Sequence, residues 1–233
     1  MTWQEVAAAL FPDGHDVAEQ GDFLSGNGRC REQEFAVVGT TNHAETGVEL
    51  ALSMAGAVLD TVRQGGGKPL LFLVDTAGQR LRRRDELLGI QRYIAHLAKT
   101  VELARRRGHR TIGLIYGQAL SGGLLPNAMM SDLCAALPQA EIRVMGLSAM
   151  AKVMRISEER LRELGATSPV FAPGAENFVK MGAVDALWEG DLARWLLDAL
   201  ARADVRDRRA EHGLLRGGRS LAHFVAERVA SDD

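Results

Sequence analysis

Two apolar runs with a long helical pattern between them constrain the fold of this 233-residue chain more than any other feature. Residues 70–74 and 111–116 are apolar runs of strand length, as expected of strands buried on both faces of a parallel sheet. Between them, residues 85–107 repeat apolar side chains at gaps of three and four, which predicts one helix. A strand, a helix and a parallel strand form a right-handed crossover, so both strands should end at the same, carboxyl, edge of the sheet.

Turns that contain glycine follow both strands, one at residues 75–79 and one after residue 116. A strand that turns into a helix leaves backbone N–H groups free to bind an anion. We therefore predict that N–H groups of the two turns converge on one carbonyl oxygen, where each such donor contributes about 3 to 4 kcal/mol in the transition state. The predicted donors are Gly78, Gln79, Gly122 and Gly123. The competing interpretation is that these are ordinary turn glycines of an α/β protein.

The rest of the chain continues the alternation of helices and strands. Helices are expected over residues 3–11, 48–62, 124–130, 148–155, 157–164, 175–181, 191–201 and 221–229, and strands over 34–39, 131–137, 140–145 and 184–188. Residues 40–42 are expected to cap the helix that follows them, and residues 167–174 to form a loop. Because no low-complexity linker or internal repeat occurs, we predict a single domain over residues 1–233, with an N-terminal extension (1–33) and a C-terminal helical tail (203–233).

Composition excludes several classes of function. A net charge of -2 gives no electrostatic reason to expect a nucleic-acid partner. The sequence contains no apolar window of membrane-spanning length and no signal peptide, so we expect a cytoplasmic protein without a membrane partner. Cys30 and Cys134 are far apart and lack histidines at ligand spacing, which argues against a metal site or a redox pair and favours a core role for Cys134.

A proton donor is not evident beside the two turns. Ser121 and Gln118 lie within the second motif, but no histidine does. The isolated residues His43, His96 and His109 are interpreted as surface or capping histidines. Asp75, at a strand end, is expected to accept hydrogen bonds from turn amides and hold the loop, with general acid or base catalysis as the alternative.

The motifs also carry a family resemblance. They are Asp75-Thr-Ala-Gly-Gln-Arg-Leu-Arg-Arg-Arg-Asp-Glu-Leu-Leu-Gly89, Gly117-x-x-x-Ser-Gly-Gly123, Ser148-Ala-Met-Ala151 and Ser168-Pro-Val-Phe-Ala-Pro-Gly174. This pattern resembles the carboxyltransferase branch of the crotonase superfamily. From about Phe35 to Leu192 the chain is similar to the gamma subunit of biotin-independent malonate decarboxylase. Pro126-Asn127 departs from the smaller residues common in related carboxyltransferases.

The resemblance implies an α/β fold, a crotonase-like ββα spiral, that pairs with a homologous beta subunit around a shared active site. In that family, malonyl thioester on an acyl carrier subunit loses CO2 and becomes acetyl thioester. The carrier holds the thioester on a phosphoribosyl-dephospho-coenzyme A arm, and an acyl carrier transferase subunit completes the complex. The resemblance implies no biotin and no metal on this chain, and it assigns the oxyanion hole to Gly78, Gln79, Gly122 and Gly123.

Polar residues beside the two motifs are candidates for further roles. Ser121, Gln118 and Arg80 are candidates for binding the substrate or its carrier. For the arginine-rich stretch 80–84, the alternative is a solvated basic helix start. The missing proton is expected from the partner chain or from water. Two other functions stay open: a biotin-dependent carboxyltransferase subunit, and a mainly structural partner of a catalytic beta subunit.

Overall fold

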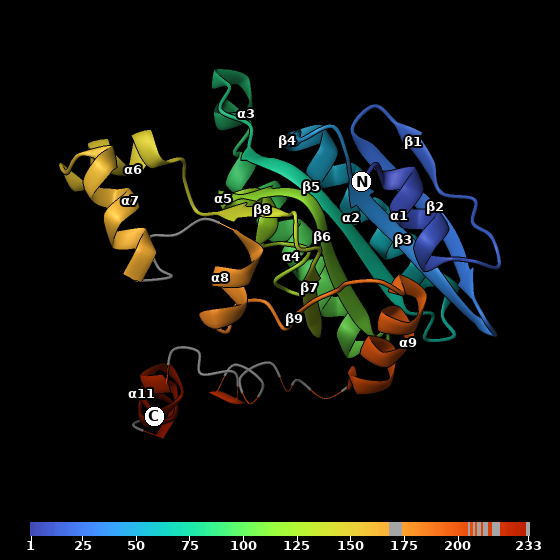
Figure 1. Ribbon diagram of the computed structural model, residues 1–233. Coiled ribbons are helices and arrows are strands. Elements are labelled where there is room, and N and C mark those ends of the chain that lie inside the picture. Colours follow the sequence, from blue (N-terminus) through green and yellow to red (C-terminus); the bar gives the residue numbers. More distant parts are fainter. Residues whose placement is uncertain are drawn as a thin grey trace.

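In the computed structural model, residues 1–167, 174–204, 206, 208, 211, 214–215 and 220–231 are described. Within these residues, nine strands form one sheet in the order β1-β2-β3-β5-β6-β7-β9, with β4 beside β5 and β8 beside β6 (Figure 1). The strands are β1 (Ala18–Gln20), β2 (Phe23–Cys30), β3 (Gln33–Thr40), β4 (Ala44–Thr46), β5 (Leu70–Gln79), β6 (Thr111–Leu120), β7 (Leu133–Ala136), β8 (Glu141–Arg143) and β9 (Ala186–Leu187).

Helices cover both faces of this sheet. They are α1 (Trp3–Leu10), α2 (Val48–Gln64), α3 (Arg83–Leu87), α4 (Ile90–Arg106), α5 (Ser121–Leu124), α6 (Leu147–Met154), α7 (Glu158–Thr167), α8 (Ala175–Lys180), α9 (Leu192–Arg202) and α11 (Ser220–Ser231). Helices α1 and α9 pack on the face that carries Leu71 and Leu73, and α2 and α4 pack on the face that carries Phe72 and Val74. The alternation of side chains along β5 therefore supplies two apolar cores.

The crossover predicted from the apolar runs is confirmed. Strands β5 and β6 pair in parallel, from Leu70 beside Thr111 to Val74 beside Ile115. The single helix predicted over residues 85–107 is wrong, because Gly89 takes a left-handed conformation with φ 77° and separates α3 from α4. Leu87, which the helical spacing placed on a buried face, is 76% exposed on α3.

Helix α2 begins at Val48, as expected, but its cap and part of its buried face differ from the prediction. Residue 40 belongs to β3, and the first helical N–H, that of Val48, donates to Oδ1 of the buried Asp85 at 3.1 Å. The predicted cap at residues 40–42 is therefore wrong, because a carboxylate from α3 meets this helix end. The spacing of Val48, Leu52, Ala55, Leu59 and Val62 predicts one apolar face; Val48 and Ala55 are buried, but Leu52 is exposed, and Met54 and Val58 are buried instead.

Strands β5 and β6 are both longer than predicted. The expected turn at residues 75–79 is strand, because β5 continues to Gln79 beside β4 after a shift in register between Val74 and Thr76. Strand β6 likewise continues to Leu120, where the predicted break into a helix is confirmed. The helix expected over 124–130 is replaced by turns after the short α5.

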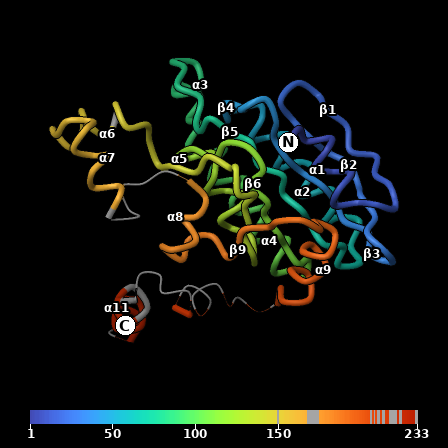
Figure 2. The backbone as a smooth tube through the Cα atoms, in the orientation of Figure 1, coloured from blue at the N-terminus to red at the C-terminus, as the bar shows by residue number. Residues whose placement is uncertain are grey.

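The two ends of the chain differ in how they join the sheet. Residues 1–33, expected as an extension, supply α1, the edge strand β1 and its neighbour β2 to the sheet and its core. At the other end, α11 is confirmed as a helix and lies apart from the sheet (Figures 1 and 2). Most of the predicted 167–174 loop lies outside the described residues. Helices α6 and α7 extend away from the sheet on the side opposite the N-terminus in both views.

Burial predicts the effect of truncating two leucines. Leu71→Ala in β5, at a fully buried side chain, should lower the free energy of unfolding by about 2 to 5 kcal/mol. Leu52→Ala in α2, at a side chain that is 51% exposed, should change it by less than about 0.5 kcal/mol. Chemical denaturation monitored by circular dichroism measures both. Equal losses would contradict the observed face of α2.

Candidate active site

The middle of the sheet exchanges its outer strands at one level along β5 and β6. Strand β3 pairs with β5 up to Leu73, and β4 takes over from Thr76. On the other side, β7 pairs with β6 up to Ile115, and β8 takes over from Gln118. The carboxyl halves of β5 and β6 therefore form a second arm of the sheet with β4 and β8. Residues 75–79, predicted as the first turn, form the β5 part of this arm, and the second predicted turn follows β6 at its end. We call residues 75–79 the first turn and the residues after β6 the second turn.

Asp75 occupies the level at which the strands change partners. Its side chain is 7% exposed, and its Oδ2 accepts the backbone N–H of His43 at 2.9 Å. Its Oδ1 accepts the backbone N–H of Gln118 at 2.8 Å and lies 2.7 Å from Nδ1 of His43. A side chain at Gly117 would collide with this carboxylate. The prediction that Asp75 holds loop and turn amides is confirmed.

Thr76 joins the first turn to the second. Its Oγ1 donates to the carbonyl of Ala44 at 2.7 Å and accepts the N–H of Gly78 at 3.0 Å. A Cβ added to Gly123 would lie 2.5 Å from the same Oγ1 and 3.0 Å from Cα of Gly78. Gly123 therefore has to be glycine for the two turns to pack together. The N–H of Gly78 is directed at Thr76 in this structure.

Gln79 follows Gly78, and its backbone N–H is directed to the other side of β5. Backbone N–H groups alternate in direction along a strand, and the N–H of Arg80 donates to Thr46 in β4 at 3.0 Å. The N–H of Gln79 consequently points away from β4, toward the end of β6. A Cβ on Gly122 would lie 3.8 Å from Cβ of Gln79, so the second turn stands directly beside it. The structure thus brings together all four predicted donor residues.

The predicted binding residues surround this point in different ways. Ser121 begins α5 in a left-handed conformation, φ 46°, which is costly for a residue with a side chain. Gln118 lies in β6, where its backbone N–H donates to Asp75 and its side chain donates to Glu141 at 3.3 Å. The side chain of Gln79 donates to Glu86 at 3.0 Å.

Arg80 is set apart from the exposed arginines that follow it. Its side chain is 21% exposed, against 64% for Arg84, and its guanidinium lies against Gly47. Glu45 and Glu49 approach it at 3.9 Å. Its Nε is buried, with no hydrogen-bond partner among the residues that the structure describes. The guanidinium is therefore held between two carboxylates and keeps one N–H without a hydrogen bond to the described part of the chain.

Sequence reasoning passed over two residues of this region. Thr76 carried no signal, because its role depends on three neighbouring elements. His43 was interpreted as isolated, yet it follows β3, a strand parallel to β5, and so reaches the same sheet edge as Asp75. His96 is exposed on α4, as expected, whereas His109 is buried and bonded to the carbonyl of Lys68 at 2.8 Å.

Tyr116 stabilises the base of the site. Its hydroxyl donates to the carbonyl of Thr40 at 2.9 Å, which ties β6 to the end of β3. Burial raises the pKa of Tyr116 far above its ordinary value, so the hydroxyl stays protonated and keeps this bond. Cys30 and Cys134 are both buried, and the core role predicted for Cys134 is confirmed.

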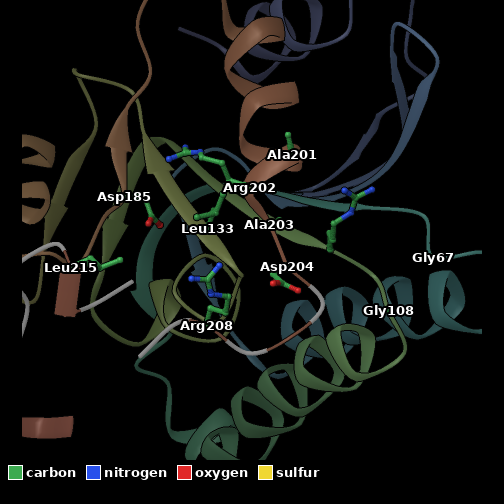
Figure 3. Close-up of a pocket in the computed structure, with 11 residues that line it drawn as sticks. Gly67, Gly108, Leu133, Asp185, Ala201, Arg202, Ala203, Asp204, Arg208 and Leu215 are labelled. Carbon is green, nitrogen blue, oxygen red and sulfur yellow. The ribbon is translucent and has the colours of Figure 1, made fainter. Parts of the chain in front are cut away.

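A cavity of about 860 Å³ lies at the opposite edge of the sheet (Figure 3). Gly67 and Gly108, which precede β5 and β6, line it together with Arg202, Asp204 and other residues of the C-terminal segment. Ligands of open α/β sheets bind at the carboxyl ends of strands, where the two turns meet, rather than at the amino ends.

Two other kinds of site are absent from the described residues. They contain no group of three or more His, Cys, Asp or Glu that could hold a metal ion. Their helices are all too short or too polar to span a membrane.

Solved structures place this architecture in one class of protein. A Pseudomonas malonate decarboxylase hetero-tetramer in complex with coenzyme A contains a chain that superposes with a TM-score of 0.79 at 23% identity, over 97% of this chain and 96% of that chain. A transcarboxylase 12S structure superposes with a TM-score of 0.72 at 20% identity, over 85% of this chain and 40% of that chain. The protein has the crotonase-type carboxyltransferase fold, as predicted.

The family is narrower than the fold. The model of the malonate decarboxylase gamma subunit family (MdcE) matches residues 41–233, and the chain belongs to that family. It is also 32% identical over 152 residues to the malonyl-S-ACP:biotin-protein carboxyltransferase MADD of Malonomonas rubra, over 61% of this chain and 52% of that protein. The chain therefore spans about half the length of this curated relative.

Adjacent glycines predict opposite outcomes on substitution. Gly123→Ala places a methyl group against Thr76 and Gly78, so it should destabilise the fold by about 1 to 3 kcal/mol. Gly122→Ala meets only Gln79 at ordinary contact distance and should change stability by less than about 0.5 kcal/mol. Thermal unfolding of both variants measures the difference. A stable Gly123→Ala protein would contradict the packing of the two turns.

Proposed function

We propose that this chain is the gamma subunit of a hetero-oligomeric malonate decarboxylase that converts malonyl-S-acyl-carrier-protein to acetyl-S-acyl-carrier-protein and CO2. The observation that carries this proposal is the position of Gln79 beside Gly122 at the end of the second sheet arm. Backbone donors in this arrangement suit a thioester oxygen that becomes negative. Membership of the gamma subunit family supports the choice of reaction.

The chemistry requires an electron sink. When the bond between the carboxylate carbon and Cα breaks, CO2 leaves and its bonding electrons pass to Cα and on to the thioester oxygen, giving an enolate. The N–H groups of Gln79, Gly122 and Gly123 are proposed to donate to that oxygen. Gly78 is proposed to contribute by its conformation, φ 98°, and through Thr76, which accepts its N–H. Fixed donors stabilise the developing charge without reorganising during the reaction.

The proposed partner is a homologous beta subunit, with the active site between the two chains. A Pseudomonas structure whose chain has this fold is described as an MdcD-MdcE hetero-dimer. Large apolar side chains are exposed after β5 and β8, at Leu81 (85%) and Val144 (64%), and on α3 and α6, at Leu87 (76%) and Val153 (71%). Exposed apolar side chains around a site are typical of a surface that another protein covers.

The proposed substrate arrives on an acyl carrier subunit, and an acyl carrier transferase subunit loads it. The carrier arm is proposed to be phosphoribosyl-dephospho-coenzyme A, with no biotin and no metal on this chain. Arg80, whose buried Nε has no hydrogen-bond partner among the described residues, is the proposed contact for the arm's phosphates, and Ser121 and Gln118 are proposed to line its path. A cytoplasmic location stays a prediction.

Two other functions fit the fold. The Malonomonas rubra relative is described as a malonyl-S-ACP:biotin-protein carboxyltransferase, in which the carboxyl group would pass to biotin instead of leaving as CO2. A mainly structural role is the second alternative, with catalysis in the beta subunit. The first predicts inhibition of the assembled complex by avidin, and the second predicts that changes in the Gly122 turn leave the rate unaltered.

The central experiment is reconstitution. The chain purified with its partner subunits should convert malonyl carrier to acetyl carrier, detected by mass spectrometry, with CO2 release and no sensitivity to avidin. Gly122→Val should assemble normally but lose about a hundredfold or more in rate, because its side chain enters the space beside Gln79. A near-normal rate for this variant would support the structural role, and avidin inhibition would support the carboxyltransferase.

A second prediction concerns the carrier. Arg80→Ala should raise the KM for carrier-bound malonate about tenfold while the fold is retained, because one charge-assisted contact to phosphate is lost. Arg83→Ala, at an exposed position of α3, is the matched control and should leave the KM unchanged. Steady-state kinetics with the carrier-bound substrate measure both. The same KM for both variants would show that Arg80 does not contact the arm.

A further inference from the structure

His43 is held in an unusual conformation at the carboxyl end of β3. Asn42 and His43 are both left-handed, with φ 58° and 51°, a conformation that side chains other than glycine adopt at a cost. The backbone N–H of His43 and its ring Nδ1 both bond Asp75, at 2.9 Å and 2.7 Å. These two bonds offset the strain. They fix the ring while leaving the side chain 61% exposed.

A carboxylate that bonds Nδ1 of a histidine is a common arrangement in general acid and base catalysis. Asp75 is buried and anchored by the N–H of Gln118, so it does not move away from the ring. A fixed carboxylate that bonds Nδ1 holds the ring in one orientation and places Nε2 on the side of the ring away from Asp75. Nε2 is thus left free of Asp75, on a side chain that is 61% exposed.

Contacts of the residue next to His43 connect it to the proposed donor residues. Ala44, its neighbour in the chain, accepts the hydroxyl of Thr76 at 2.7 Å. That same hydroxyl accepts the N–H of Gly78 at 3.0 Å, and Thr76 packs against Gly123. Thr76 therefore contacts Gly78, Gly123 and the residue that follows His43 in the chain.

We propose that His43 is the proton donor of the reaction, a catalytic role that rests on the proposed decarboxylation. After CO2 leaves, the enolate returns its electron pair to Cα, and that carbon takes the proton from Nε2 of the imidazolium. The thioester carbonyl reforms, the product is the acetyl thioester, and the neutral ring regains a proton from water. Asp75 positions the ring and offsets its charge throughout.

The test uses the complete complex with three variants. His43→Asn keeps a donor for Asp75 and favours the left-handed conformation, but it has no Nε2. His43→Gln is a second variant in case the first fails to fold, and His96→Gln, on the exposed face of α4, is the matched control. Each complex is assayed for decarboxylation and for exchange of deuterium from D2O into the methyl group of the acetyl carrier, which is the reverse of the protonation step.

Both His43 variants should lose about a hundredfold or more in decarboxylation and in deuterium exchange, with the KM for the malonyl carrier unchanged, as expected of a lost general acid. His96→Gln should match the wild type. A folded His43→Asn or His43→Gln complex that exchanges deuterium within threefold of the wild-type rate would overturn the inference alone. A wild-type complex that does not decarboxylate malonyl carrier would instead overturn the proposed function, and the inference with it.

Discussion

The carboxylate of Asp75 holds together the level at which the sheet changes strands. When β3 gives way to β4 and β7 to β8, backbone N–H groups lose the regular ladder that would satisfy them. Asp75 accepts two of these groups, from His43 and Gln118, on opposite sides of β5. Leaving such donors buried without a partner costs about 1 to 3 kcal/mol each. A single side chain therefore stabilises the level at which the two arms of the sheet meet.

The change of strands determines which residues meet beyond it. Strands β5 and β6 continue to Gln79 and Leu120 in the second arm, so that Gln79 and Gly122 lie side by side at its end. Thr76 fixes their separation by contacts to Ala44, Gly78 and Gly123. Most of these contacts involve backbone atoms. Their geometry consequently depends on the fold as a whole, which is the property required of a preorganised oxyanion site.

A site built from backbone donors stabilises charge but supplies no proton. The proposed reaction needs both. The same Asp75 carboxylate that holds the two arms of the sheet together also orients the ring of His43. The exposed apolar side chains on α3 and α6 fit a site that is completed by a second chain, which would exclude water from the enolate. The same group of residues thus stabilises the meeting of the two arms, supports the proposed donor pair and orients the proposed acid.

The sequence by itself determined the parallel crossover and the meeting of the two turns, because long apolar runs have few alternatives to a buried parallel strand. Its motifs also indicated the family and the fold, both of which are confirmed. The local pattern could not predict the continuation of β5 through residues 75–79, since that strand depends on pairing with β4. The break at Gly89 was likewise missed, because a regular spacing of apolar residues does not reveal a left-handed glycine.

Only the tertiary structure decided which polar groups meet. The cap of α2 comes from Asp85, 37 residues away from Val48 in the sequence, and the partner of His43 is 32 residues away. Spacing along the chain carries no information about such contacts, because they form where separate elements end side by side. The sequence therefore predicted which edge of the sheet holds the proposed site, and the packing of β3, β4, β5 and β6 decided which side chains lie together there.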